Sequence, residues 1–378
     1  MKKISFFSSL PPFRGGISHF SQLVCRSLEF KSELKTYTFK TQYPSILFPG
    51  KSQFITNKDS VELKAKRIVS TFNPFSYFKA ARTIKKDNPQ YFICNYWMSF
   101  FGPMFGFISR SLPKNVVKVA IIHNLTPHEK RFFDKAFNRY FLKSFDGFIA
   151  LSDFVYQDII SMNKEKPAMV LSHPAYTNFN DPIDSFKARD ILQIDTDKKT
   201  VLFFGIIRDY KGLDLLIDAF NYLDDTFQLL IVGEVYGNDI KYKNQIDANP
   251  NKPRINFINK YIDDQDVHLY FSAADCLVLP YRSGTQSGVA AIADKFALPV
   301  LTTAVGGISE KIEVGVNGFI INELSGKCIA KNINSCTGLL LKKKMLDKHK
   351  MQKEDEANEW DLFADKTLKF IESINKSN

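Results

Sequence analysis

The chain has 378 residues, a formal net charge of +11 and 44% hydrophobic residues. This length is too great for one ordinary hydrophobic core and fits two domains. No apolar run approaches the roughly 20 residues that span a bilayer, and the apolar start, Ile4 to Phe7, is too short for a signal peptide. A membrane-spanning or secreted protein is therefore not expected. Five scattered cysteines without a CxxC pair predict buried thiols in a reducing compartment.

The positive charge is concentrated in the first half of the chain. Residues 1–196 carry 28 Lys and Arg against 15 Asp and Glu, whereas the remainder carries 23 against 25. This excess predicts an anionic partner, such as a phospholipid surface, a lipid-linked phosphate or nucleic acid. Ordinary solubility charge on exposed helices is the alternative. No nucleic-acid recognition motif accompanies the charge, so nucleic acid is not an expected partner.

A strand, a glycine-rich turn and a helix open the chain. Lys2 to Ser8 is typical of a strand, Gly15 and Gly16 follow, and an amphipathic helix begins at Ile17. Free backbone N–H groups at such a helix start can bind an anion. Residues 36–60 are aromatic, contain proline and show no period, which predicts a loop.

The remainder of the first half alternates between predicted helices and strands. Strands are predicted at 91–94, 116–122, 147–151 and 170–171, and helices at 74–84 and within 95–112. The strand over 116–122 ends at His123. Ligands of open α/β sheets bind at this edge, so His123 is a candidate site residue. His128 and Glu129 lie just beyond, and a surface histidine pair is the alternative interpretation.

The second half opens on Val201–Phe220, where strand formers end at Gly205 and a helical pattern begins at Leu213. Arg208 and Lys211 stand between strand and helix. A planar guanidinium fork and a mobile ammonium together suit a diphosphate. An ordinary solvated loop with two surface cations is the alternative.

Strands and helices alternate in two blocks, which predicts two doubly wound Rossmann-like α/β domains facing each other across a cleft. In the second block, strands are predicted at 228–232, 255–258, 276–279 and 299–301, and helices at 264–271, at 289–296 and from Ser309. The predicted domains are 1–175 and 197–356, and the polar segment 176–196 is the predicted hinge. Residues 331–355 are expected to form an exposed helix. A closing helix within 357–378 is expected to join the first domain. No cluster has metal-ligand spacing, so no metal is expected.

Several motifs occur in one order along nearly the whole chain. They are PFRGG, HN-x-x-PHE, R-x-x-K-G, GE, AADCLVLPY, TQSGV and ALPVLTTAVGGISE. This set resembles retaining glycosyltransferases of family four, which have the GT-B fold. Within that family it is similar to a bacterial branch that builds surface polysaccharide, such as lipopolysaccharide or capsule.

The resemblance implies roles for individual residues. Gly15 and Gly16 match the loop that approaches the donor phosphate and sugar, and His123 matches the histidine near the transferred sugar. Arg208 and Lys211 match the cations that hold the donor diphosphate. The nucleotide pocket is matched by Gly205, Gly233 and Glu234.

The chain departs from the family in one motif. Two glutamates eight positions apart usually follow the strand that here ends at Pro280, and their places are taken by Gly284 and Ile292. The turn retains Thr285, Gln286, Ser287 and Gly288. Its backbone N–H groups can face phosphate, and Gln286 or Ser287 could hydrogen-bond the sugar.

The resemblance therefore implies a metal-independent hexosyltransferase without a cofactor. Its expected donor is a nucleotide-diphosphate sugar, its acceptor is a glycan or lipid-linked glycan, and the anomeric configuration is retained. A cytoplasmic location follows, with peripheral contact to the anionic inner membrane as a hypothesis. The alternatives are another GT-B enzyme, such as a sugar-nucleotide epimerase or a phosphorylase, and a catalytically silent relative that acts as a binding scaffold.

Overall fold

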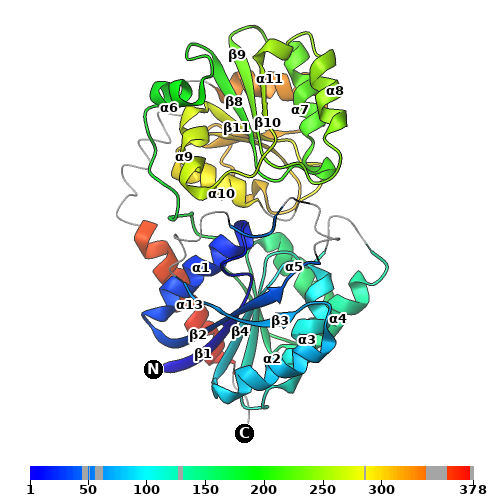
Figure 1. The fold of residues 1–378 in the computed structure, drawn as a ribbon, viewed down its shortest axis with the longest axis vertical. Helices are drawn as coiled ribbons and strands as arrows, with labels where there is room; N and C mark the ends of the chain where they lie inside the picture. Colours follow the sequence, from blue (N-terminus) through cyan, green and yellow to red (C-terminus); the bar gives the residue numbers. More distant parts are fainter. Residues whose placement is uncertain are drawn as a thin grey trace. The chain divides into compact units, whose positions relative to one another are not determined.

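The computed structural model describes residues 1–44, 50, 52–55, 63–126, 131–284, 287–337 and 356–374, with side chains in the last range from 359 onward. The chain divides into two compact units (Figure 1). The first unit is Met1–Pro174 together with Ala357–Asn378, and the second is Ala175–Glu356.

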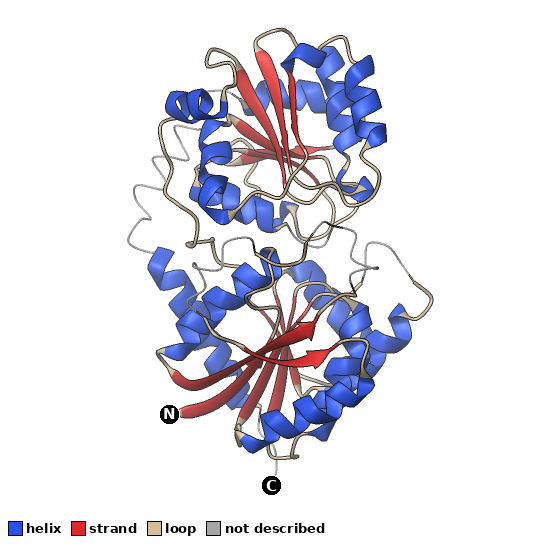
Figure 2. Ribbon diagram, viewed as in Figure 1, coloured by secondary structure: helices blue, strands red, loops and turns tan. Residues whose placement is uncertain are grey.

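The first unit is built on a seven-stranded parallel sheet with helices on its faces (Figure 2). The strand order is β3-β2-β1-β4-β5-β6-β7. The strands are β1 Lys2–Phe7, β2 Ser32–Thr41, β3 Lys66–Ser70, β4 Tyr91–Tyr96, β5 Val117–Ile122, β6 Gly147–Ala150 and β7 Ala168–Val170. The helices are α1 Gly16–Glu29, α2 Pro74–Lys86, η3 Ser99–Phe101, α3 Gly102–Ser111, α4 Asp134–Ser144, α5 Asp153–Met162 and α13 Glu356–Ser373.

The core of this unit lies at the centre of its sheet. All six residues of β5 are buried, as expected for a parallel strand that helices cover on both faces. The adjoining helices contribute apolar side chains to the same cluster, among them Met104, Phe105 and Phe141. The start of α2 follows ordinary capping chemistry: the side chain of Asn73 accepts a hydrogen bond from the backbone N–H of Phe75 at 3.1 Å, and Pro74 is the first helical residue.

The second unit is built on a six-stranded parallel sheet, in the order β10-β9-β8-β11-β12-β13. The strands are β8 Lys199–Phe204, β9 Phe227–Val232, β10 Ile255–Ile258, β11 Cys276–Leu279, β12 Val300–Thr303 and β13 Gly318–Ile321. The helices are α6 Ser185–Leu192, η4 Asp209–Lys211, α7 Leu213–Ala219, η5 Phe220–Tyr222, α8 Ile240–Ala248, η6 Lys252–Arg254, α9 Asp264–Ala273, α10 Gly288–Lys295, η7 Ser309–Lys311 and α11 Gly326–Cys336.

The last helix, α13, packs into the first unit although it follows the second unit in the chain. Trp360 and Phe363 lie against Phe20 of α1, with ring centroids 5.5 and 5.7 Å away. Lys31 forms an ion pair with Asp365 at 2.6 Å. The first unit is therefore completed by the end of the chain.

The sequence-based predictions of local structure differ from the structure in several places. The loop predicted over 36–60 is a strand as far as Thr41, because SELKTYTFKT is rich in β-formers that pair with β1. The short, partly charged strand β3 is not predicted at all, and neither are β13, α4 and α8. The segment at Ser309 is a 3-10 turn in place of a helix.

Another difference is α6, a helix inside the predicted hinge. The side chain of Asp184 caps it by accepting a hydrogen bond from the N–H of Lys187 at 3.0 Å. Arg189 anchors it by an ion pair with Asp275 at 2.6 Å. Most of the predicted Lys-rich helix over 331–355 lies outside the described residues.

Candidate functional site

The strand order of the second unit reverses direction beside β8. From β8 the chain moves to β9 on one side, and it later returns to β11 on the other side. Ligands of open α/β sheets bind at the carboxyl ends of the strands, where such a reversal occurs. A ligand of this unit is therefore expected against the residues that follow β8, β9 and β11.

Gly205 and Gly233 bring the ends of β8 and β9 into backbone contact. A Cβ atom on Gly233 would lie 1.8 Å from the carbonyl oxygen of Gly205, which leaves no room for a side chain. Both glycines have positive φ, 105° at Gly205 and 151° at Gly233. The N–H of Ile207 then donates to the carbonyl oxygen of Glu234 at 2.9 Å. These two glycines are thus required by the backbone geometry of the site.

The loop after β8 is also joined to the loop after β11. A Cβ atom on Gly212 would lie 2.1 Å from the carbonyl oxygen of Pro280. The N–H of Arg282 donates to the carbonyl oxygen of Tyr210 at 2.7 Å, and its guanidinium pairs with Asp214 at 2.6 Å. Three loops at the carboxyl edge are therefore tied together around residues 205–212.

Lys211 is the central charged residue of this edge. Its side chain is buried, and its Nζ atom lies 5.3 Å from the centre of the Tyr281 ring. A Cβ atom on Gly205 would lie 3.5 Å from the same Nζ atom. No carboxylate of the described residues forms an ion pair with it. A buried ammonium without a carboxylate is costly, and a bound anion would offset that cost.

The pKa of Lys211 reflects this environment. Burial lowers it from the usual value, and the nearby charge of Arg208 lowers it further. Arg208 is half-buried and is the N-cap residue of η4, the short helix that contains Lys211. Two cations within one turn of backbone are an arrangement that suits a diphosphate. Glu234, which was predicted to line the nucleotide pocket, is buried with 3% of its surface exposed.

The turn before α10 is described only in part. Thr285 and Gln286, which were predicted to bind the donor, lie outside the described residues. Ser287 is the N-cap residue of α10, and Gly288 is the first helical residue. A Cβ atom on Gly288 would lie 3.3 Å from the Tyr176 hydroxyl oxygen, so this helix start is closely packed.

The two positions that lack the family's glutamates are apolar. A Cβ atom on Gly284 would lie 2.3 Å from the Cδ1 atom of Ile308, so the isoleucine fills the space of a side chain at 284. Ile292 is buried in α10. No carboxylate is therefore offered at either position. Ile308 and Tyr281 were not singled out from the sequence, because nothing in their local pattern distinguishes them from other core residues.

The first unit reverses its strand order between β1 and β4. Gly15 lies after β1 and is the N-cap residue of α1, with φ of 102° and its carbonyl oxygen bonded to the N–H groups of Ser18 and His19. A Cβ atom there would meet nothing within 4 Å, so the conformation alone requires glycine. Gly16 is the first residue of α1. The helix start predicted to approach an anion therefore lies at the carboxyl edge of this sheet.

His123 follows β5 at the same edge. Its N–H donates to the carbonyl oxygen of Tyr96 at 2.8 Å, and its side chain is 8% exposed. The Nε2 atom is buried and has no hydrogen-bond partner among the described residues. Burial, together with the nearby His173, lowers the pKa of His123 from 6.5 to about 3. The imidazole is therefore neutral at physiological pH.

A cluster of aromatic rings, here called the aromatic bracket, packs around Phe20 beside His123. This cluster was not predicted from the sequence. We use this name for Phe20, His173, Trp360 and Phe363. The Phe20 ring meets His123 edge to face, with centroids 4.6 Å apart, and lies 4.8 Å from His173. Trp360 contacts both Phe20 and His173. The contact between His123 and α1 therefore depends on residues from both segments of the first unit.

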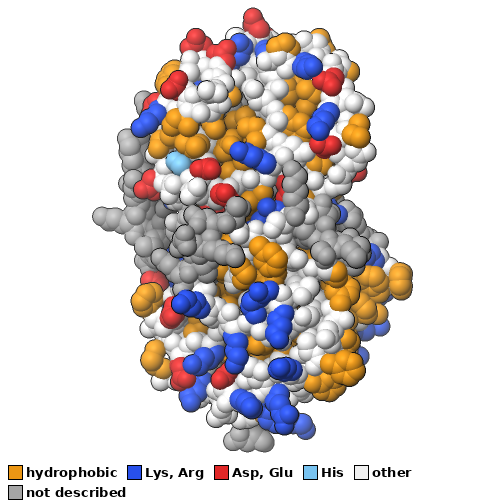
Figure 3. Space-filling model, in the orientation of Figure 1, with side chains coloured by type: hydrophobic (Ala, Val, Ile, Leu, Met, Phe, Trp, Pro, Cys, Tyr) orange, Lys and Arg blue, Asp and Glu red, His pale blue; other side chains and the backbone are white. Residues whose placement is uncertain are grey.

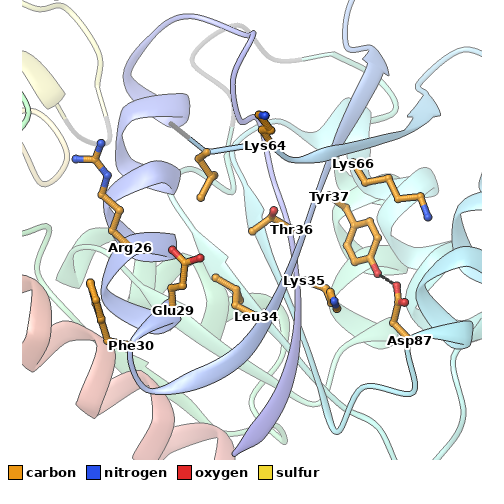
Figure 4. Close-up of a pocket in the computed structure, with 11 residues that line it drawn as sticks. Arg26, Glu29, Phe30, Leu34, Lys35, Thr36, Tyr37, Lys64, Lys66 and Asp87 are labelled. Carbon is orange, nitrogen blue, oxygen red and sulfur yellow. Dashed lines mark hydrogen bonds between the residues drawn. The ribbon is translucent and has the colours of Figure 1, made fainter. Parts of the chain in front are cut away.

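A cavity of about 780 Å³ lies elsewhere in the first unit (Figure 4). Its lining includes Arg26 and Glu29 from α1, Leu34 from β2 and Lys66 from β3. These residues come from the end of α1 and the first halves of the two strands, so the cavity lies away from the edge that carries Gly15 and His123. None of the predicted site residues lines it.

In the described ranges, no group of three or more His, Cys, Asp or Glu side chains is arranged to hold a metal ion. Across the same ranges, no helix combines the length and the hydropathy that crossing a bilayer requires.

Residues 184–353 match the family model of glycosyl transferases group 1. This segment carries the loops around Lys211. The second unit is thus similar to group 1 glycosyl transferases over most of its length.

Curated relatives of the chain come from several bacteria and an archaeon. D-inositol 3-phosphate glycosyltransferase of Mycolicibacterium vanbaalenii is 28% identical over an alignment of 193 residues, with 47% of this chain and 42% of the relative covered. Spore coat protein SA of Bacillus subtilis is 26% identical over 250 residues, covering 59% of this chain and 64% of the relative. The chain thus matches about half the length of its curated glycosyltransferase relatives.

Solved structures match over almost the whole chain. HepE of Anabaena in complex with UDP-glucose gives a TM-score of 0.73 at 17% identity, with 98% of each chain covered. WaaG, a glycosyltransferase involved in lipopolysaccharide biosynthesis, gives 0.64 at 18% identity, with 96% of this chain and 95% of WaaG covered. The chain has the GT-B fold, with two parallel Rossmann-like sheets.

Proposed function

We propose that the protein is a retaining glycosyltransferase that moves a hexosyl group from a nucleotide-diphosphate sugar to an acceptor hydroxyl. Lys211 carries this proposal. It is a buried ammonium without a carboxylate partner in the described chain, at the carboxyl edge where the strand order reverses. The group 1 match over residues 184–353 supports the same reaction class.

The chemical problem of the reaction is the negative charge that builds on the leaving diphosphate. Fixed cations and backbone N–H groups stabilise such charge without reorganising during the reaction. Lys211 and Arg208 would supply the cations, and the start of α10 at Ser287 and Gly288 would supply N–H groups. This arrangement needs no metal ion to neutralise the diphosphate.

His123 would act as a neutral hydrogen-bonding group. Because its pKa is about 3, the imidazole stays neutral near neutral pH and does not act as an acid or base there. Its buried Nε2 atom is available to a sugar hydroxyl or to the developing positive charge of the transferred sugar. The acceptor proton would then pass to the leaving phosphate oxygen, with no protein base required.

The proposed acceptor is a glycan or lipid-linked glycan of the cell surface, reached from the cytoplasm. The ordered motifs of the polysaccharide-building branch support this assignment. The structural relatives HepE, solved with UDP-glucose, and WaaG, involved in lipopolysaccharide biosynthesis, are consistent with it.

The test follows release of nucleoside diphosphate from UDP-, ADP-, GDP- and dTDP-sugars, with and without a glycolipid extract as acceptor. Release should depend on the acceptor, and NMR of the product should show the anomeric configuration of the donor. Arg208→Gln should slow release about 100-fold, the order of effect of losing one oxyanion donor. Lys327→Gln, an exposed cation of α11, is the matched control. Near-native turnover by Arg208→Gln would rule out the assignment.

A catalytically silent relative is the second candidate, and one observation favours it. Gly284 and Ile292 replace both glutamates of the family motif, and Ile308 fills the space at 284. Such a protein would bind a nucleoside diphosphate but release none from any sugar nucleotide. An epimerase would convert the donor without an acceptor, and a phosphorylase would require inorganic phosphate.

A further inference from the structure

Three neighbouring helices cover one face of the first unit's sheet, and their charge is one-sided. Helices α2, α3 and α4 lie side by side, α3 contacting both others (Figure 1). Together they carry one acidic residue, Asp134, which is buried. Their cations are Lys79, Arg82, Lys85, Lys86, Arg110, Lys135, Arg139 and Lys143, all of them exposed.

Asp134, the acidic residue of these helices, is hydrogen-bonded to neighbouring residues of the same unit. Asp134 accepts hydrogen bonds from the N–H of Arg131 and from the hydroxyl of Ser99. None of the eight cations forms an ion pair within the described chain. The face therefore presents positive charge without a compensating carboxylate on its own helices.

Large aromatic side chains are exposed on the same face. Phe75 is 84% exposed and Phe132 is 98% exposed. Phe72 and Phe78 are also exposed, and each contacts the ring of a half-buried neighbour. Phe72 is tilted against Phe100 at 4.8 Å between ring centroids, and Phe78 meets Phe107 edge to face at 4.5 Å. Figure 3 shows hydrophobic side chains gathered on the right-hand flank of this unit, with Lys and Arg beside them. We call these four exposed phenylalanines and eight cations the α2–α4 face.

Two of the exposed aromatic residues, Phe72 and Phe132, lie at the end of the face that is nearest His123. Phe72 follows β3 and Phe132 follows β5, so both lie at the carboxyl edge of the sheet. His123 follows β5 at this same edge. An aromatic group that entered a lipid headgroup layer here would bring the His123 edge close to that layer.

We infer that the α2–α4 face docks on an anionic phospholipid surface. Exposed aromatic rings insert at the boundary between headgroups and acyl chains, while Lys and Arg pair with acidic headgroups. The inference rests on the proposed function only in explaining why docking would be useful, because a lipid-linked acceptor would lie in that surface. An acidic protein partner would use the cations but would not require exposed rings to enter a bilayer.

Co-sedimentation of the full chain with vesicles tests the inference. Binding should be strong to vesicles of phosphatidylcholine with 30% phosphatidylglycerol and weak to pure phosphatidylcholine, and it should fall at 0.5 M salt. The triple variant Lys79→Gln/Arg82→Gln/Lys85→Gln should bind the acidic vesicles about 100-fold less tightly, at about fivefold for each cation. Lys327→Gln/Lys331→Gln, on exposed positions of α11, should bind like the wild type.

A second variant and its control test the contribution of the aromatic residues to vesicle binding. Phe75→Ser/Phe132→Ser should lower vesicle binding at least tenfold, whereas Phe186→Ser, an exposed phenylalanine of α6, should not change it. Equal binding of wild type to both vesicle types, or unchanged binding of both face variants, would overturn the inference. Acidic-polymer binding without vesicle binding would indicate a protein partner and would also overturn it.

A second measurement separates this inference from the proposed function. Stabilisation by nucleoside diphosphate is measured by thermal unfolding without vesicles. Phe75→Ser/Phe132→Ser should retain the full ligand-induced shift, because neither residue belongs to the unit that carries Lys211. Loss of vesicle binding with an intact shift supports the docking face alone, and an absent shift in the wild type contradicts the donor site alone.

Discussion

At the scale of single residues, burial tunes two groups to different tasks. Under the proposed function, a bound phosphate would offset the cost of burying the Lys211 ammonium. Burial has a different result at His123, whose side chain is neutral because its pKa falls to about 3. In the proposed function, Lys211 would bind the negatively charged diphosphate, and His123 would offer hydrogen bonding without charge.

The depressed pKa of His123 makes stability depend on pH. Between about pH 6.5 and pH 3 the unfolded state binds a proton that the folded state does not bind, so the free energy of unfolding falls as pH is lowered. From pH 6.5 to pH 5 this residue should cost about 2 kcal/mol. Urea unfolding of the wild type and His123→Asn at both pH values measures the effect.

For each protein, the free energy of unfolding at the lower pH is compared with its own value at the higher pH. His123→Asn should be less stable than the wild type at pH 6.5, yet its loss of stability between pH 6.5 and pH 5 should be smaller than that of the wild type. Equal losses in the two proteins would mean that His123 has the same pKa in the folded and unfolded states, so that it gains a proton near its ordinary pKa. In that case the role as a neutral group near the sugar would be withdrawn.

At the scale of elements, the site depends on loops that contact one another through backbone. Gly233→Ala should destabilise by several kcal/mol, because its Cβ atom would meet the Gly205 carbonyl oxygen at 1.8 Å. Gly237→Ala is the matched control in the same loop. It also has positive φ but meets nothing within 4 Å, so it should cost only about 1–2 kcal/mol of backbone strain. The midpoint of urea unfolding measures both, and equal costs would contradict the close approach.

Much of the secondary structure follows from local sequence. The apolar runs that predicted β5, β8, β9 and β11 are strands, because a fully buried parallel strand needs apolar residues on both faces. Strand β3 was missed. Its sequence is KRIVS, and the two charged residues at its start interrupt the apolar pattern that indicates a strand. Helix α6 was missed because its stability comes from Arg189 and the packing of α6 on α9, which no local pattern reveals.

At the scale of the whole molecule, the chain's last helix completes the first unit. Trp360 is 5% exposed and contacts Phe20, which in turn contacts His123. Trp360→Ala should therefore lower the free energy of unfolding of this unit by about 3–5 kcal/mol. Hydrogen exchange should quicken in α1 and β5 and stay unchanged in β8 and β9. Leu362→Ala, at a 49% exposed position of the same helix, should change neither.

The candidate site could be predicted only in part from the sequence. Gly205, Gly233 and Lys211 stand in recognisable positions at the ends of apolar strands, and the structure gathers them within one unit. The aromatic bracket could not be predicted, since Phe20, His173 and Trp360 are far apart in the chain. The burial of Lys211 beside Tyr281 likewise arises from tertiary packing.

Calorimetric titration of nucleoside diphosphates into the wild type and Lys211→Met tests the central claim most directly. The wild type should bind at least one of UDP, ADP, GDP and dTDP. Lys211→Met should lose about 10- to 100-fold in affinity for it, the value of a charge-assisted hydrogen bond. Without ligand the variant should be at least as stable as the wild type, because a buried charge is replaced by an apolar chain of similar size. Unchanged affinity in Lys211→Met, beside an unchanged Lys327→Met control, would contradict the account.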